Sequence, residues 1–85
     1  MKKNIDLETA GIILMKEFID NSDYTINFIS DMSGVSIDVL YGLINGSIEF
    51  DKENDQKLTK FFNLSQGYFL RLQEDYKQRK EKRND

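Results

Sequence analysis

The 85-residue chain contains neither cysteine nor histidine. Without cysteine it can form no disulfide and offers no thiol nucleophile, and without histidine it lacks the commonest metal ligand and general base. Carboxylates remain, but no acidic loop carries a glycine at the spacing of a calcium-binding loop. We therefore expect a protein that is not an enzyme and that uses no metal and no cofactor.

Proline is absent as well, glycine occurs only five times, and long apolar runs are missing. So few turn residues favour helices over a β-sandwich. The longest apolar run, residues 12–15, is far too short to span a bilayer. Asp6 and Glu8 interrupt the N-terminal segment, which therefore does not resemble a signal peptide. We expect a soluble, cytoplasmic, all-α protein without a membrane partner.

Positive charge is missing from the middle of the chain, where no lysine or arginine lies between Phe18 and Asp51. That stretch contains the carboxylates of Asp20, Asp23, Asp31, Asp38, Glu49 and Asp51. The cations gather near the C-terminus, at Arg71, Lys77, Arg79, Lys80, Lys82 and Arg83. Together with a net charge of −3, this distribution argues against general binding to nucleic acid.

The spacing of apolar residues predicts five helices, each preceded by a side chain that can accept hydrogen bonds from the first turn. In chain order, the expected N-caps are Asp6 or alternatively Thr9, then Thr25, Ser36, Asp51 and Ser65. One wide apolar stripe along the first helix consists of Ile12, Leu14, Met15, Phe18 and Ile19. The expected ends are residues 21–23, 33, 44 and 62, with fraying from residue 77 in the fifth helix. Residues 1–77 are thus predicted to form one domain, and residues 78–85 a charged, frayed tail.

The junction between the second and third helices, residues 33–36, matches the turn of a helix-turn-helix. Gly34 can adopt the left-handed conformation that such a turn requires. Val35 is placed to fill the gap between the two helices, and the small Ser30 lets them cross closely. The sequence therefore predicts two short crossed helices that present residues 36–44 outward.

Residues 34–46 resemble the XRE class of helix-turn-helix domains, to which lambda repressor and Cro belong. Further matching positions lie at Glu17, Phe18, Lys60, Phe61, Phe62, Ser65, Tyr68, Phe69, Leu70, Arg71, Leu72, Gln73 and Tyr76. Together, over residues 11–76, the chain resembles the HigA-type plasmid-maintenance antitoxins. In that family a serine, an aromatic pair, Leu-x-Leu-Gln and a following tyrosine recur in the fifth helix.

The resemblance implies a five-helix, lambda-repressor-like domain and a non-enzymatic homodimer. Such antitoxins neutralise a ribonuclease toxin and repress their own operon by placing two recognition helices in successive major grooves. The positions that would contact double-stranded DNA are Thr25, Ser36, Ile37, Asp38, Tyr41 and Asn45. The positions that would form a protein interface are Ile26, Phe28, Met32, Tyr68, Leu72 and Tyr76. For Phe69 and Leu72, the alternative is packing in the core of a single chain.

The sequence departs from that family at the surface of the helix-turn-helix. Asp38 would face a polyanion, so DNA binding would be weak. Positions that are polar or basic in the family hold Ile26, Phe28, Met32, Ile37 and Val39. Apolar residues on a normally wet surface are typical of a protein interface. The alternative is therefore a helix-turn-helix scaffold turned acidic protein-binding inhibitor without DNA binding: a phage or mobile-element inhibitor, an antirepressor or an anti-CRISPR-like nucleic-acid mimic.

Three carboxylates close together in the sequence, Asp51, Glu53 and Asp55, could be acid–base or metal groups. Helix capping and surface charge explain them better. Asp55 and Gln56 stand where the antitoxin family has small or apolar residues, so the fourth helix is expected to be rotated or more loosely packed.

Overall fold

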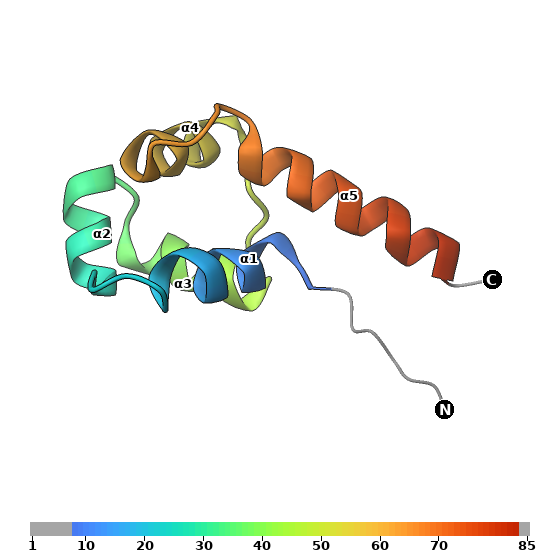
Figure 1. Cartoon of the computed structure of the whole chain (residues 1–85), viewed down its shortest axis with the longest axis horizontal. Helices are drawn as coiled ribbons and strands as arrows, with labels where there is room; N and C mark the ends of the chain where they lie inside the picture. The colour runs from blue at the N-terminus through green and yellow to red at the C-terminus, as the bar shows by residue number, and fades with distance from the viewer. Residues whose placement is uncertain (1–7, 84–85) are drawn as a thin grey trace.

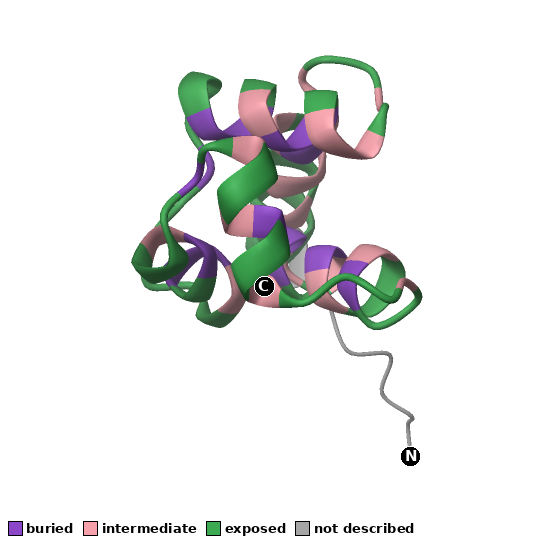
Figure 2. Cartoon of the chain, turned by 90° about the vertical axis from the view of Figure 1, so that its left-hand side faces the viewer, coloured by how far each residue is buried: buried purple, intermediate pink, exposed green. Residues whose placement is uncertain are grey.

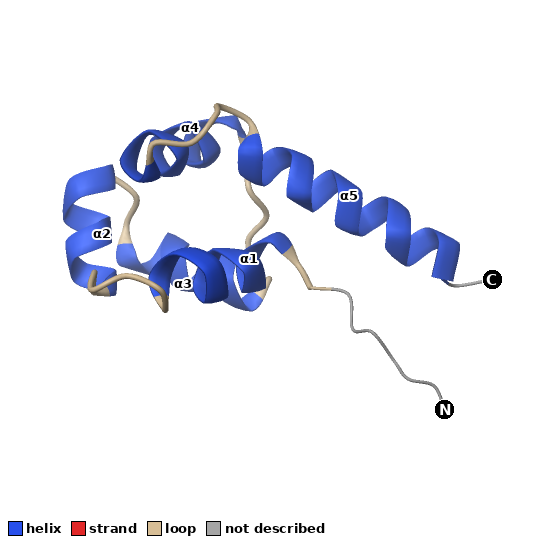
Figure 3. Cartoon of the chain, viewed as in Figure 1, coloured by secondary structure: helices blue, strands red, loops and turns tan. Residues whose placement is uncertain are grey.

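Helices make up every regular element of the part of the chain that the computed structural model describes, residues 8–83 (Figures 1 and 3). In chain order they are α1 (Ala10–Ile13), continued by η1 (Leu14–Ile19), then α2 (Ile26–Ser33), α3 (Ile37–Asn45), α4 (Lys52–Phe62) and α5 (Tyr68–Arg83). Counting α1 and η1 as one helix, these residues form a compact five-helix globule without a strand, from which the C-terminal half of α5 projects. The predicted all-α class is confirmed. None of the helices among these residues has the length and hydrophobicity needed to cross a membrane.

Four of the predicted N-caps are confirmed. In each, the side-chain oxygen accepts a hydrogen bond from the amide three residues further on. The distances are 3.1 Å at Thr9, 3.0 Å at Thr25, 3.2 Å at Ser36 and 2.9 Å at Asp51. The first helix thus starts at the second of its two expected caps, while Asp6 lies outside the described residues. Just before this start, Glu8 pairs with Lys16, and their hydrogen bond raises the pKa of the lysine.

The turn between α2 and α3 has the predicted conformation. Gly34 has a φ of +86°, and its amide donates to the carbonyl of Ser30 at 3.0 Å. Val35 is buried, as expected of a residue that fills the gap between the two helices. A left-handed Gly46 ends α3 in the same way, one residue later than predicted.

The first helix is wider than the sequence pattern predicts. From Leu14 its hydrogen bonds span five residues instead of four, and the last one joins the Asp20 amide to the Met15 carbonyl at 2.8 Å. The wider turn buries both Leu14 and Ile19, which stand five residues apart. The predicted stripe is therefore wrong at Ile12, which is exposed, because the stripe assumed a regular α-helix.

The predicted cap of the fifth helix, Ser65, is wrong. The helix starts at Tyr68, and its first amides are bound by Asp55 of α4 instead. Asp55 Oδ2 accepts from the Gly67 amide at 2.7 Å, and Oδ1 accepts from the Phe69 amide at 2.9 Å and the Leu70 amide at 3.3 Å. Asp55 is only 1% exposed. It is therefore not surface charge, and a buried carboxylate here complements the positive end of α5.

The fifth helix also extends beyond the predicted point of fraying at Lys77. It continues to Arg83, so residues 78–83 of the predicted tail are helical. An ion pair between Asp75 and Arg79, at 3.1 Å, supports this part of the helix. Lys77 pairs with Glu49 at 3.2 Å and so ties the helix to the loop before α4. Residues 78–83 are mostly strong helix formers, and the prediction of a frayed tail gave too little weight to this propensity.

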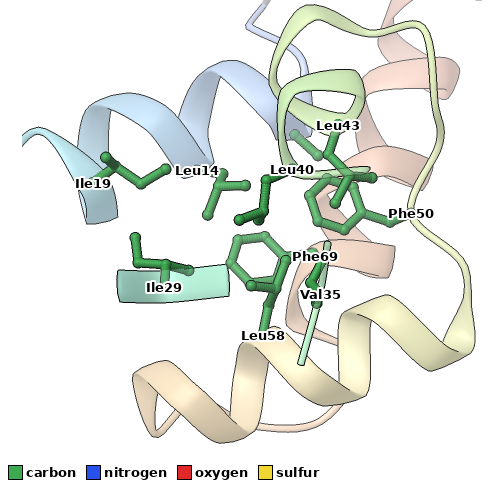
Figure 4. Packing of buried hydrophobic residues seen from close by; sticks show 10 residues of the cluster. Leu14, Ile19, Ile29, Val35, Leu40, Leu43, Phe50, Leu58 and Phe69 are labelled. Atoms are coloured by element: carbon green, nitrogen blue, oxygen red, sulfur yellow. The ribbon is translucent and has the colours of Figure 1, made fainter. Parts of the chain in front are cut away.

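The core lies between the helices and draws on all of them (Figure 4). Its fully buried apolar side chains are Leu14, Ile29, Leu40, Leu43, Leu58 and Phe69. Phe69 stacks on Phe50 with ring centres 5.0 Å apart and contacts Phe18 edge-on at 5.7 Å. The Gln73 side chain fixes the loop before α4, since it accepts from the Phe50 amide at 2.7 Å and donates to the Phe50 carbonyl at 3.0 Å. The core thus holds α2 and α3 against the other helices and leaves their outer sides free.

Candidate functional site

The six positions expected to contact DNA are all exposed, on α3 or beside the helix starts. Three of their side-chain oxygens, however, already accept hydrogen bonds from the local backbone. The hydroxyl groups of Thr25 and Ser36 accept the cap hydrogen bonds, and Asn45 Oδ1 accepts from the Ser47 amide at 2.9 Å. The remaining three side chains are Ile37, Asp38 and Tyr41. None of these three carries the positive charge or the amide group that usually reads base edges.

The outer side of α2 carries two large apolar residues. Ile29 points into the core and is fully buried, whereas Phe28 and Met32 are 43% and 62% exposed. These two residues stand four apart and therefore lie on one side of the helix. Figure 2 looks onto α2 and shows that much of its outer side is exposed. Ile26, by contrast, is half-buried and packs against the core.

Aromatic rings continue this apolar surface beyond α2. Tyr24, just before the helix, stacks on Phe28 with ring centres 5.1 Å apart and planes inclined by 21°. Phe61 of α4 packs edge-on against both rings, and its ring centre lies 5.3 Å from that of Tyr24 and 6.1 Å from that of Phe28. Each ring therefore has few positions open to it, which lowers the entropy lost when a partner covers the pair.

We call this region the α2–α3 face. It consists of the exposed apolar residues Tyr24, Phe28, Met32, Ile37 and Tyr41 and the exposed carboxylates Asp31 and Asp38. Tyr24 and Phe61 were not among the predicted site residues. The spacing of four between positions 24, 28 and 32 is a signal that would have found Tyr24. Nothing in the sequence indicates Phe61, since it approaches the other rings only through the packing of α4 on α2.

The electrostatics of the α2–α3 face are dominated by carboxylates, because α2 and α3 contain no lysine or arginine. One ammonium group reaches the turn between them from α4. Lys57 Nζ donates to the Gly34 carbonyl at 3.4 Å and pairs with Glu53 at 3.0 Å. Its charge is thus largely balanced, and the face keeps its acidic character.

The interface residues expected in α5 lie elsewhere. Tyr68 contacts Phe18 edge-on at 5.7 Å and belongs to the packing within the chain, and Leu72 is likewise half-buried. Tyr76 lines a groove of about 360 Å³ between α5, the start of α1 and the loop before α4, with Lys80 Nζ 5.9 Å from its ring centre. The structure therefore brings Phe28 and Met32 onto one exposed surface but does not join the three α5 residues to it.

The α2–α3 face offers apolar area, aromatic rings and two carboxylates, which are groups that can bind another molecule through direct contacts. Residues 8–83 contain no group of carboxylates arranged to hold a metal ion. Comparisons with family models, with curated proteins and with solved structures gave no match. A function for this chain must therefore be argued from its own residues.

Proposed function

We propose that this chain is a non-enzymatic regulator on a lambda-repressor-like helix-turn-helix domain, and that it acts by binding another protein through the α2–α3 face. In the antitoxin class that the sequence resembles, such a partner is a toxin. The observation that carries the proposal is the exposure of Phe28, Met32, Ile37 and Tyr41 on two adjoining helices without a cation. Large exposed apolar side chains concentrated in this way are typical of surfaces that another protein covers.

Capture of the partner on the tagged chain, followed by binding measurements with the purified pair, tests this proposal. Substitution of Phe28 and Met32 by serine should weaken binding at least about tenfold, because two exposed anchors would lose their apolar contacts. The matched control is Ile12→Ser, which alters an exposed apolar residue on a different helix. A double variant that binds the purified partner as tightly as the wild type would contradict the proposal.

Binding to double-stranded DNA through the same helices is the second candidate. It is favoured by the position of α3, which follows a tight turn and lies on the surface with the predicted contact residues exposed. Backbone amides at the helix start could bind phosphates, but Asp31 and Asp38 would repel them. This candidate therefore predicts weak binding with little sequence preference.

A gel-shift experiment with short duplexes of random sequence separates the two candidates. At an ionic strength of about 0.15 M, we expect the wild-type chain to retain no duplex, because unpaired carboxylates face the phosphates. The variant Asp31→Lys with Asp38→Lys should bind at least about tenfold more tightly, since repulsion becomes attraction. Retention of duplexes by the wild type, weakening steeply with added salt, would favour the DNA-binding candidate instead.

A further inference from the structure

Each helix of the α2–α3 face places a carboxylate beside an exposed aromatic ring. Asp31 follows Phe28 by three residues on α2, and Asp38 precedes Tyr41 by three residues on α3. Residues three apart on a helix are neighbours on its surface. All four side chains are exposed, and among residues 8–81, whose side chains the structure describes, no ion pair includes Asp31 or Asp38. Two ring–carboxylate pairs are thus exposed, one on each of two helices that pack against each other.

The guanidinium group of arginine is the side-chain group that binds best to an aromatic ring next to a carboxylate. Its plane can stack on the aromatic face while its N–H groups donate to the carboxylate oxygens. The exposed apolar residues that lie between the pairs in the sequence, Met32 and Ile37, can cover the methylene stems of the same side chains. We propose that the occupant of the α2–α3 face is an arginine-rich surface of the partner protein. This inference rests on the proposed function and adds the chemistry of the partner to it.

The negative charge of the α2–α3 face favours an arginine-rich surface over other possible occupants. The α2–α3 face carries the exposed carboxylates Asp31 and Asp38, and its two helices contain no lysine or arginine, so a basic surface is attracted to it, whereas phosphates of nucleic acid or of an anionic membrane are repelled. A purely apolar partner would leave Asp31 and Asp38 buried without a counter-charge, which is unfavourable. An arginine-rich surface supplies both the apolar stems and the counter-charges.

A fluorescently labelled peptide of nine arginines provides the probe, with binding followed by fluorescence anisotropy at about 0.05 M salt. Wild-type chain should bind the peptide, and the variant Asp31→Asn with Asp38→Asn should bind it at least about tenfold more weakly. The matched control is Glu74→Gln with Glu81→Gln, which changes the net charge equally at two exposed sites on α5. This control should retain nearly all of the affinity, which excludes an effect of net charge alone.

The role of the rings is tested separately with Phe28→Leu and Tyr41→Leu, which keep apolar area but remove the aromatic face. Each should lower the affinity for the arginine peptide several-fold, and a nine-lysine peptide should bind more weakly than the arginine peptide to the wild type. Circular dichroism confirms that each variant is folded.

Absence of binding by the wild type, or equal losses in the two carboxylate variants, would overturn the inference. If the captured partner still depends on Phe28 and Met32 in that case, the proposed protein-binding function stands and only the chemistry of the partner is wrong. If binding of the captured partner does not depend on Phe28 and Met32 either, the proposed function and the proposed chemistry of the partner are both wrong.

Discussion

Replacing Asp55 with alanine is expected to lower the free energy of unfolding by about 3–5 kcal/mol. The substitution removes the acceptor of three amides at the start of α5, one of which, that of Phe69, is fully buried. Each amide left without a partner costs on the order of 1–3 kcal/mol, and hydrogen bonds to a charged group are among the stronger ones. Because small domains have total stabilities of only about 5–15 kcal/mol, this loss is a large fraction of the free energy of unfolding.

Urea unfolding followed by circular dichroism measures this effect. Asp55→Asn should be intermediate, since the amide keeps one acceptor oxygen but turns an N–H donor toward a backbone N–H. The matched control is Asp51→Ala, which removes an exposed cap of α4 and should cost only about 1 kcal/mol. If Asp55→Ala cost no more than Asp51→Ala, the buried carboxylate would not be the link that fixes α5 to α4.

Substitution of Gly11 by alanine is expected to destabilise the fold by about 3 kcal/mol. Gly11 lies where α1 crosses α3, and an added Cβ atom would overlap the carbonyl oxygen of Leu43. Helix propensity alone predicts the opposite sign, a gain of up to about 1 kcal/mol from replacing glycine in a helix. The steric term is larger, because the obstructing atom is backbone and cannot turn aside, so the two helices must move apart.

Gly46→Ala separates this packing effect from backbone strain. Gly46 has a φ of +88° but open space where its Cβ would lie. Its substitution should therefore cost only about 1–2 kcal/mol, the penalty of a left-handed alanine. Thermal unfolding of both variants gives the comparison. A Gly11→Ala chain that is as stable as the wild type would show that α1 and α3 do not approach as closely as described.

Both substitutions bear on the candidate site because the α2–α3 face depends on the helices behind it. Gly11 sets the distance between α1 and α3, and Asp55 joins α4 to α5. Phe61 of α4 in turn supports the Tyr24–Phe28 stack. We therefore expect the α2–α3 face to lose affinity when its supports are disturbed, even though neither Gly11 nor Asp55 lies on it.

Local features were predictable because the atoms that create them lie within a few residues of each other. Thr25 and Ser36 accept from amides three positions away, and Gly34 takes up the left-handed conformation that most residues avoid. The bounds of α2 and the exposed positions of α3 follow from such short-range terms. The same holds for the acidic character of the α2–α3 face, which is a matter of composition.

Only the tertiary structure decided the remaining features, since each depends on groups far apart in the chain. Asp55 caps a helix that begins more than ten residues later, which no capping pattern indicates. Phe61 reaches the Tyr24–Phe28 stack because α4 packs on α2, and the wide turn at Leu14 buries two side chains that a regular helix would separate. The sequence by itself thus determined where α2, α3 and α4 begin, which helices carry no cation and which residues can serve as contacts. The packing of the helices on one another determined which of these contact residues are exposed and which are held in place by neighbouring side chains.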